Sequence, residues 1–332
     1  MQRSRLILPA LTATALALFA QVPTGGAAPA MEWREVFNED GSITQALTPK
    51  APAERTTTGL RSLATANVTQ IAGDDRPSSE RFDLVFVGDG YTADDLATYA
   101  ANVQSKWDEL SAVEPFREYK YLFKVWRVDV ISNESGVDHD PTKGVLKDTA
   151  LDMGFWCQGR DPNTERLLCV NEAKAKEYAA LAPEADQVIA LGNTSKYGGA
   201  GGSVATAAGS NAQSGQIAVH ELGHSIGGLA DEYEYPYATY TGAEPREINV
   251  TADPTGAKWG TYLGQDSPDG GVIAPVEGAR YYKNGLYRPT ANSIMRTLGR
   301  EFNLIGRDAM IKAFKAKVQS PATAAAPPAA AR

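Results

Sequence analysis

Residues 219–233 read VHELGHSIGGLADEY and contain the motif H-E-x-x-H. On a helix, residues four apart lie about 40° from each other around the axis, so His220 and His224 can bind one ion from one face. Glu221 is next to the first histidine and can reach a water at that ion. Two neutral imidazoles and a carboxylate base are what zinc-dependent hydrolysis requires. The stretch therefore predicts a catalytic zinc site on a helix, residues 214–228.

The residues around this motif favour a metal site over a chance match on an amphipathic helix. The chain has three histidines, and two of them lie in the motif. Gly227 and Gly228 can end the helix soon after the second histidine. Asp231 and Glu232 follow that turn, as a third ligand would.

A competing motif overlaps the first one. Residues 223–227 fit G-x-S-x-G, the nucleophile elbow of lipases and esterases. That fold needs an acid and then a histidine after the serine, but no histidine follows His224. A serine hydrolase is excluded on this ground, and we expect Ser225 to be a small residue packed near the helix end.

The first thirty residues resemble an export signal. Arg3 and Arg5 precede an apolar run over residues 6–20, and small residues follow as far as Ala30. Pro9 interrupts a run that is already short for a membrane span. We predict a signal peptide over residues 1–30, cleaved after Ala20 or after Ala30, and a secreted or periplasmic protein.

Charge narrows the range of partners. Removing residues 1–30 removes two arginines and no acid, so the formal charge falls from −8 to −10. An acidic exported protein is a poor candidate for binding nucleic acid or anionic membranes. We expect a protein or peptide substrate, no nucleic acid, and no membrane contact after signal removal.

The two cysteines, Cys157 and Cys169, lie close together in the exported part of the chain. We predict a disulfide between them, since oxidising compartments favour one. Closing a loop this short stabilises the fold by about 3 kcal/mol.

The remaining sequence predicts one main domain. Residues 31–76 are polar and irregular and are expected to form an N-terminal extension with one or two short strands. The zinc domain is expected over residues 77–318, followed by a disordered Ala/Pro-rich tail at 319–332.

Strands and helices alternate within this domain. Strands are predicted at 82–87, 122–131 and 187–191, and helices at 92–110, 172–181 and about 307–318. Gly88 and Gly90 loosely fit a dinucleotide fingerprint, but aspartates crowd the place where a pyrophosphate would lie. The alternation predicts an α/β fold with a mixed, twisted sheet. His139 lies in a loop between two aspartates, which is more typical of a surface group than of a ligand.

A run of small residues precedes the zinc helix and predicts a strand at the edge of the sheet. An extended substrate could pair with such a strand. Its residues are Ser203, Val204, Ala205, Thr206 and Ala207.

Taken together, these motifs resemble the IgA-peptidase family of secreted bacterial zinc peptidases, metallopeptidase family sixty-four, in the metzincin-like clan. The resemblance runs from about Asp83 to Phe302. Its segments are Gly88–Thr92, Glu134–Gly136, Tyr197–Gly199, His220–His224 with Leu229–Tyr233, Lys258–Trp259, Glu277–Ala279, Tyr287–Pro289 and Ser293–Arg296.

The resemblance implies a metzincin-like zinc peptidase domain with one Zn²⁺ per chain. It implies that Met295 is the Met-turn methionine beneath the metal. Two departures are visible: the N-terminal β-domain of the family is shortened to residues 31–76, and Ser293 stands where a cysteine is expected. The family name records immunoglobulin cleavage by a founding member, and we do not transfer that substrate.

The third ligand follows from the same resemblance. Metzincins place it six residues after the second histidine, but that position is Ala230, which cannot bind a metal. Asp231 is one residue further on. The glycine turn of metzincins comes three residues after the second histidine, and Gly228 is likewise one residue beyond that position. We therefore expect Asp231 to be the third ligand, with Glu232 as the alternative.

These residues predict a secreted zinc endopeptidase in which Glu221 is the general base. A zinc amidase acting on cell-wall peptides would share this chemistry. A binding protein or adhesin on a peptidase scaffold is a third possibility, although a purely structural zinc site has no use for Glu221.

Overall fold

The computed structural model describes residues 30–50 and 66–319. Its centre is a six-stranded sheet in the order β3-β5-β4-β6-β8-β7. The strands are β3 (Asn67–Ala72), β5 (Phe123–Asp129), β4 (Phe82–Asp89), β6 (Gln187–Gly192), β8 (Ala205–Ala208) and β7 (Gly199–Ala200). The four inner strands run parallel, and β3 and β7 are antiparallel to their neighbours. The predicted mixed α/β sheet is confirmed.

Helices cover both faces of this sheet, so its central strands are buried on both sides. Along β4, Leu84 and Phe86 pack in one apolar cluster and Val85 and Val87 in another. The first cluster joins the sheet to α1 (Leu96–Ser111), α5 (Gly215–Ser225) and α6 (Leu304–Gln319). The second cluster contains residues of α4 (Glu172–Ala179). Parallel strands buried on both faces explain the continuous apolar run at 82–87.

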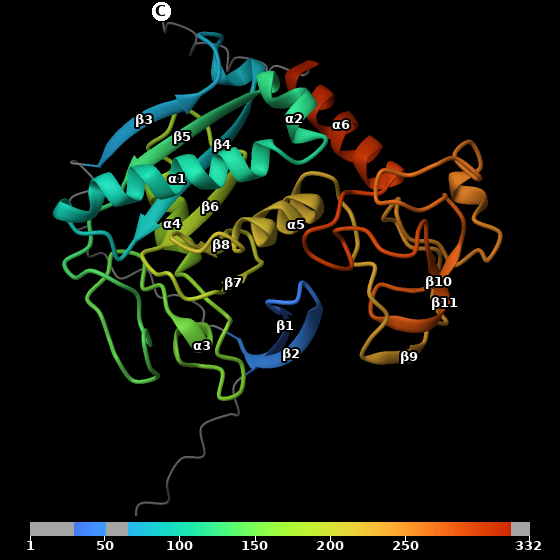
Figure 1. The fold of residues 1–332 in the computed structure, drawn as a ribbon, viewed down its shortest axis with the longest axis horizontal. Helices are drawn as coiled ribbons and strands as arrows, with labels where there is room; N and C mark the ends of the chain where they lie inside the picture. Colours follow the sequence, from blue (N-terminus) through green and yellow to red (C-terminus); the bar gives the residue numbers. More distant parts are fainter. Residues whose placement is uncertain (1–29, 51–65, 320–332) are drawn as a thin grey trace, which may run out of the picture.

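Two smaller sheets lie outside this core. An N-terminal hairpin pairs β1 (Met31–Phe37) with β2 (Ile43–Pro49). A three-stranded sheet has the order β10-β11-β9, formed by Val276–Ala279, Tyr282–Arg288 and Tyr237–Thr239. Figure 1 shows the hairpin between the main sheet and this C-terminal sheet, next to the C-terminal end of α5.

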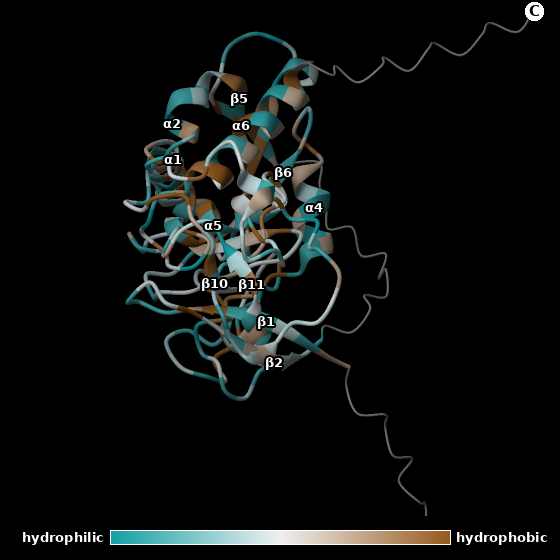
Figure 2. Ribbon diagram, turned by 90° about the vertical axis from the view of Figure 1, so that its right-hand side faces the viewer, coloured by the Kyte–Doolittle hydropathy of each residue, from teal (hydrophilic) through white to brown (hydrophobic). Residues whose placement is uncertain are grey.

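The short elements complete the chain. They are α2 (Phe116–Tyr119), α3 (Phe155–Gln158) and the 3-10 turns Ser78–Glu80, Ala93–Asp95, Lys120–Leu122 and Ala257–Trp259. In Figure 2 the apolar segments concentrate in strands and helices inside the molecule, and hydrophilic segments follow its outline.

Most predicted elements lie within a few residues of their expected bounds. The helix predicted from Thr92 begins with a 3-10 turn, where the Thr92 backbone N–H donates to the Asp95 carboxylate (3.0 Å). The final helix begins at Leu304, three residues earlier than predicted. The helix predicted over residues 214–228 is shorter in the structure, where α5 covers Gly215–Ser225.

The predicted substrate-edge strand is wrong in two respects. Ser203 and Val204 precede β8, which begins at Ala205 and extends to Ala208. Moreover, β8 lies between β6 and β7, so the outermost strand on this side of the sheet is β7, and both of its residues are buried. A two-residue strand with a glycine has no periodicity that sequence analysis could detect.

The main sheet also begins earlier than predicted. Strand β3 lies within the range 31–76 that we assigned to the extension, and it pairs with β5. The extension visible in the structure is therefore the β1–β2 hairpin.

Two predictions concern residues outside the described ranges. The signal peptide at 1–30 falls on residues 1–29 apart from Ala30, and the tail at 319–332 falls on residues 320–332 apart from Gln319. Within residues 30–50 and 66–319, no helix combines the length and the apolar character needed to cross a membrane.

A disulfide joins Cys157 to Cys169, as predicted. Both cysteines are buried, in a cluster with Val36 of β1 and Leu167. We expect non-reducing intact-mass analysis after alkylation to find no modified cysteine. The double variant Cys157→Ser/Cys169→Ser should lose about 3 kcal/mol of unfolding free energy, since the loop between the cysteines is short. Two alkylated thiols in protein from the native compartment would contradict the pairing.

Candidate metal centre

The motif H-E-x-x-H lies on α5, whose apolar side packs against the main sheet. Ala218, Val219 and Leu222 belong to the central cluster of buried residues. His220 and His224 therefore lie on the side that faces away from this core, towards the hairpin and the segment after the helix. His220 is fully buried, and the side chain of His224 is 25% exposed.

Both imidazoles are held by backbone carbonyls. His220 Nδ1 lies 3.0 Å from the Ile294 carbonyl oxygen, and His224 Nδ1 lies 2.7 Å from that of Leu229. A carbonyl only accepts, so each Nδ1 carries the proton and each Nε2 keeps a free lone pair. The two Nε2 atoms lie 3.0 Å apart, which presents two metal-binding nitrogens at one point.

A glycine turn brings Asp231 back to the histidines. Gly228 has a φ of 60°, a left-handed conformation that side chains rarely adopt. The Gly228 N–H donates to the His224 carbonyl (3.0 Å), which ends the helix as a C-terminal cap. The chain then reverses, and Asp231 Oδ1 lies 3.3 Å from the Nε2 atoms of both His220 and His224.

Neighbouring residues fix the orientation of this carboxylate. The Tyr281 hydroxyl donates to Asp231 Oδ2 (2.6 Å). The Asn249 side chain bonds both the N–H and the carbonyl of Ala230, the residue before it. Asp231 is only 2% exposed, and its Oδ1 has no hydrogen-bond donor among the described residues.

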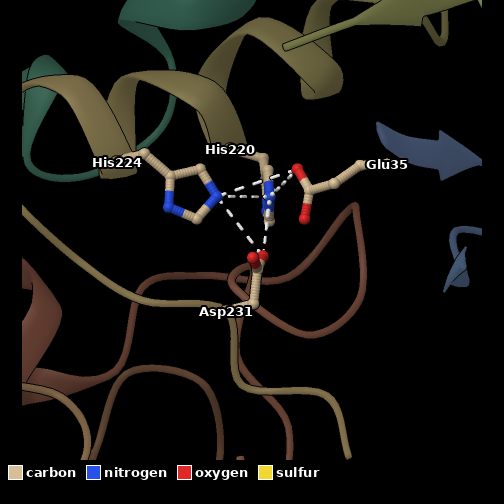
Figure 3. Close-up of side chains that lie close together, drawn as sticks. All are labelled: Glu35, His220, His224 and Asp231. Atoms are coloured by element: carbon tan, nitrogen blue, oxygen red, sulfur yellow. Dashed lines mark hydrogen bonds and ion pairs between the residues drawn. The ribbon is translucent and has the colours of Figure 1, made fainter. Parts of the chain in front are cut away.

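A fourth candidate ligand, a carboxylate that the sequence analysis did not predict, comes from the hairpin. Glu35 Oε2 lies 3.4 Å from His220 Nε2 and 3.8 Å from His224 Nε2. Glu35 Oε1 accepts a hydrogen bond from the Tyr233 hydroxyl (2.7 Å). Figure 3 shows the four side chains converging, with the two histidines descending from the helix, Glu35 reaching in from one side and Asp231 from below.

These separations fit a tetrahedral zinc site. Zn²⁺ bonds of about 2.0–2.1 Å place tetrahedral ligands about 3.3 Å apart. Five of the six separations among the donor atoms are 3.0, 3.3, 3.3, 3.4 and 3.8 Å, and the sixth, between Glu35 and Asp231, is within 4.8 Å. Two imidazole nitrogens and two carboxylate oxygens are also ligand types that zinc accepts.

The electrostatics of the cluster require positive charge at its centre. Burial lowers the pKa of His220, but Asp231 and Glu35 outweigh it and raise that pKa well above its ordinary value. Against the same burial, Asp231 raises the pKa of His224 to about 9. Either added protons or a divalent cation can supply this charge. The 3.0 Å separation of the two Nε2 atoms favours the cation, because protons on both Nε2 atoms would point at each other across this distance.

Glu221 is buried beside the donor set. It is 7% exposed, and its Oε1 has no hydrogen-bond partner among the described residues. Burial, with the nearby Glu35 second, raises the pKa of Glu221 to about 8. Its carboxylate lies against Gly201, where a Cβ would come within 2.3 Å of Oε1. A side chain at position 201 would therefore displace this carboxylate.

Glu232, the alternative third ligand, points away from the histidines. Its carboxylate accepts hydrogen bonds from Asn249 (2.9 Å), Ser293 (2.7 Å) and Asn303 (2.8 Å). Burial nevertheless raises the pKa of Glu232 above its ordinary value. Ser293, which stands in place of the expected cysteine, thus connects this buried acid to the segment below the site.

Met295, predicted from the resemblance to be the Met-turn methionine, packs against α5 at Gly223. It is 1% exposed, and a Cβ at Gly223 would approach its Sδ to 2.5 Å. The preceding residue, Ile294, supplies the carbonyl that holds His220. The Met295 carbonyl accepts from the Glu232 N–H (2.8 Å), so one short segment supports both sides of the site.

Two predictions about other residues are wrong. His139 is not a surface group: it is 8% exposed, and its Nδ1 accepts from the Gly144 N–H (2.9 Å). It belongs to neither of the possible metal-binding groups found in the described residues. Ser225 is exposed rather than packed, and its hydroxyl donates to the Glu221 carbonyl (3.1 Å).

The structure is an α/β domain whose H-E-x-x-H helix faces a returning acid, an arrangement that a metal-dependent peptidase can use. The chain belongs to the family described as IgA Peptidase M64, whose model matches residues 71–269 and 265–314. The match covers most of the main sheet, α5, Asp231 after the glycine turn and the segment around Met295. No curated protein matches the chain at a significant level.

Proposed function

We propose that this protein is a secreted zinc-dependent endopeptidase. One Zn²⁺ per chain is held by His220, His224 and Asp231, and Glu221 is the general base. The observation that carries the proposal is the position of Glu221, a buried carboxylate with a free oxygen beside three converging donors. Membership of the IgA Peptidase M64 family supports peptidase activity, and because this is a metallopeptidase family it also supports dependence on a metal ion.

Zn²⁺ bound at these residues would supply a Lewis acid that acidifies a water and polarises the scissile carbonyl. Glu221 accepts the proton of the attacking water and passes it to the leaving amine. Burial raises the pKa of Glu221 above its ordinary value, and a more basic carboxylate accepts the proton of a water more readily. The carbonyls of Ile294 and Leu229 hold the imidazole Nδ1 protons and fix both rings.

Substrate binding along the sheet edge remains part of the proposal, with the strand corrected. The edge strand β7 leads into Gly201, which contacts the Glu221 carboxylate. An extended peptide that paired with β7 would pass close to the general base. The signal peptide predicted from the sequence would export the protein, so we propose an extracellular or periplasmic protein substrate.

The free oxygen of Glu221 also weighs against a purely binding or adhesin role. A structural metal site is closed and needs no base. A buried carboxylate oxygen without a hydrogen-bond donor lowers the stability of the fold, and a catalytic role would explain why the protein has one. A cell-wall amidase would use the same residues, so the substrate must decide between amidase and protease.

We expect the purified protein to cleave members of a diverse peptide library, and a chelator to abolish the cleavage. Mass spectrometry of the library after long incubation gives the sites, and a parallel sample of peptidoglycan stem peptides tests the amidase. Zinc added after chelation should restore the cleavage, with one zinc bound per chain. Cleavage that survives complete metal removal would refute the proposal. Cleavage of stem peptides alone would replace the protease with the amidase.

A further inference from the structure

The hairpin residue Glu35 occupies a position that the peptidase reaction needs free. We propose that Glu35 is a fourth metal ligand and that the β1–β2 hairpin holds the active site closed. This inference rests on the metal-dependent function proposed above. It adds a residue to the metal site and makes this form of the chain a latent one.

The first step of the argument is coordination. Catalytic zinc sites have three protein ligands and an open position, whereas structural sites have four. His220, His224 and Asp231 already provide three ligands, and Glu35 Oε2 lies at ligand–ligand distance from both histidines. Two carboxylates would also balance both charges of the ion. Glu35 therefore fills the position that a water or a substrate carbonyl would take.

The second step is the location of the strand that carries Glu35. Strand β1 lies beside the edge strand β7. The Arg34 guanidinium donates to the Gly201 carbonyl (3.3 Å), next to the carboxylate of Glu221. The hairpin thus lies across the same edge that an extended substrate would use. A peptide and the hairpin cannot occupy this edge together.

The third step is that the hairpin is docked and not merely nearby. Phe37 and Ile43 are fully buried in a cluster with Ile217 of α5, Tyr197, Tyr233 and Leu298. Phe37 also packs edge-on against the His220 ring, with centroids 5.5 Å apart.

One backbone and one side-chain hydrogen bond connect the hairpin to both sides of the site. The Leu298 N–H donates to the Gly41 carbonyl (2.9 Å) on the C-terminal side. The Arg166 guanidinium donates to the Asn38 side chain (3.0 Å) on the side of the main sheet. The hairpin therefore connects the main sheet to the C-terminal segment on either side of the site. Its Glu35 carboxylate is the group that lies close to Nε2 of both histidines.

A readout independent of catalysis tests the ligand. We expect zinc to slow hydrogen exchange of the amides in residues 31–49 by at least about tenfold in the parent chain, since a metal–ligand bond stabilises the docked hairpin. The variants Glu35→Ala and Glu35→Gln should show no such zinc dependence. The glutamine keeps an oxygen that can accept from the Tyr233 hydroxyl, so the hairpin can stay docked while the charge of the ligand is lost. This variant therefore distinguishes loss of the metal ligand from undocking of the hairpin.

Glu32→Ala is the matched control. Glu32 lies on the same strand but pairs with Arg34 and not with the metal ligands. We expect this variant to retain the zinc-dependent protection of the parent. Exchange that is equally fast in the parent with and without zinc would overturn the proposal.

A second measurement tests closure of the site. Acetohydroxamate, a small metal-binding probe, is titrated into the Co²⁺-substituted protein and followed by visible absorption. We expect Glu35→Ala to bind the probe at least about tenfold more tightly than the parent, because the probe no longer competes with a protein ligand. Equal dissociation constants in the two proteins would overturn the proposal.

Peptide cleavage by the same proteins separates this inference from the proposed function. We expect kcat/KM to rise at least about tenfold in Glu35→Ala, with little change in Glu32→Ala. If Glu35→Ala binds the probe more tightly but no variant cleaves a peptide, the fourth ligand stands and the peptidase function fails. If parent and variant cleave and bind the probe equally, the function stands and the closed site is refuted.

Discussion

Glu221→Gln is expected to retain its metal while losing at least about two decades in kcat, because an amide cannot accept the proton of the attacking water. Glutamine has nearly the same shape as glutamate, so it should fit against Gly201 without moving α5. Metal content by elemental analysis and initial rates on a cleaved peptide measure the two effects separately. The thermal midpoint should not fall, since the variant removes a buried carboxylate whose Oε1 has no donor in the described structure.

Glu234→Gln is a suitable control for this variant. Glu234 lies close to Asp231 in the sequence, but its carboxylate pairs with Arg296 (2.8 Å). Its replacement should leave kcat within a few-fold of the parent. Both variants should also be measured with Glu35→Ala present, so that a closed site does not conceal the difference. Near-normal turnover in zinc-loaded Glu221→Gln would mean that Glu221 is not the general base.

The sequence predicted the features that depend on residues close together in the chain. The helix that carries His220 and His224 follows from a spacing of four, and the turn at Gly228 follows from a glycine that tolerates a positive φ. The buried strand β4 follows from an unbroken apolar run. The return of Asp231 follows from the position of that turn, once a family arrangement indicates where an acid is needed.

The features that were missed depend on contacts between distant segments. Glu35 lies 185 residues before His220 on a strand whose pattern does not distinguish it from Glu32. Its role becomes visible only when the hairpin docks beside α5. Similarly, the edge of the sheet is set by β7 folding back on β8, and His139 is buried by Trp156 against its ring. No local pattern of hydrophobicity or charge encodes such contacts.

The largest expected loss of metal comes from the third ligand. Asp231→Ala should weaken zinc binding by more than about a hundredfold, the upper range for loss of an outer partner of a ligand. The reason is geometric: Asp231 Oδ1 lies 3.3 Å from both Nε2 atoms, and the alanine offers no donor atom. Competition with a fluorescent zinc chelator measures the dissociation constant. As a fourth ligand, Glu35 would preserve part of the zinc affinity when Asp231 is replaced. The titration is therefore made both in the parent and in the Glu35→Ala background.

Glu232→Ala is the matched comparison, since the two acids are adjacent and both are buried. Its removal leaves donors of Asn249, Ser293 and Asn303 unpaired, at about 1–3 kcal/mol for each buried group that finds no other partner. We therefore expect a lower thermal midpoint, with a much smaller change in zinc affinity than in Asp231→Ala. Asn249 also hydrogen-bonds the backbone of Ala230, the residue before Asp231. Loss of the Glu232 carboxylate can therefore shift Asn249, move Asp231 slightly and weaken zinc binding modestly. If Asp231→Ala binds zinc like the parent while Glu232→Ala does not, the ligand is Glu232, and the loop after Gly228 must rearrange when the metal binds.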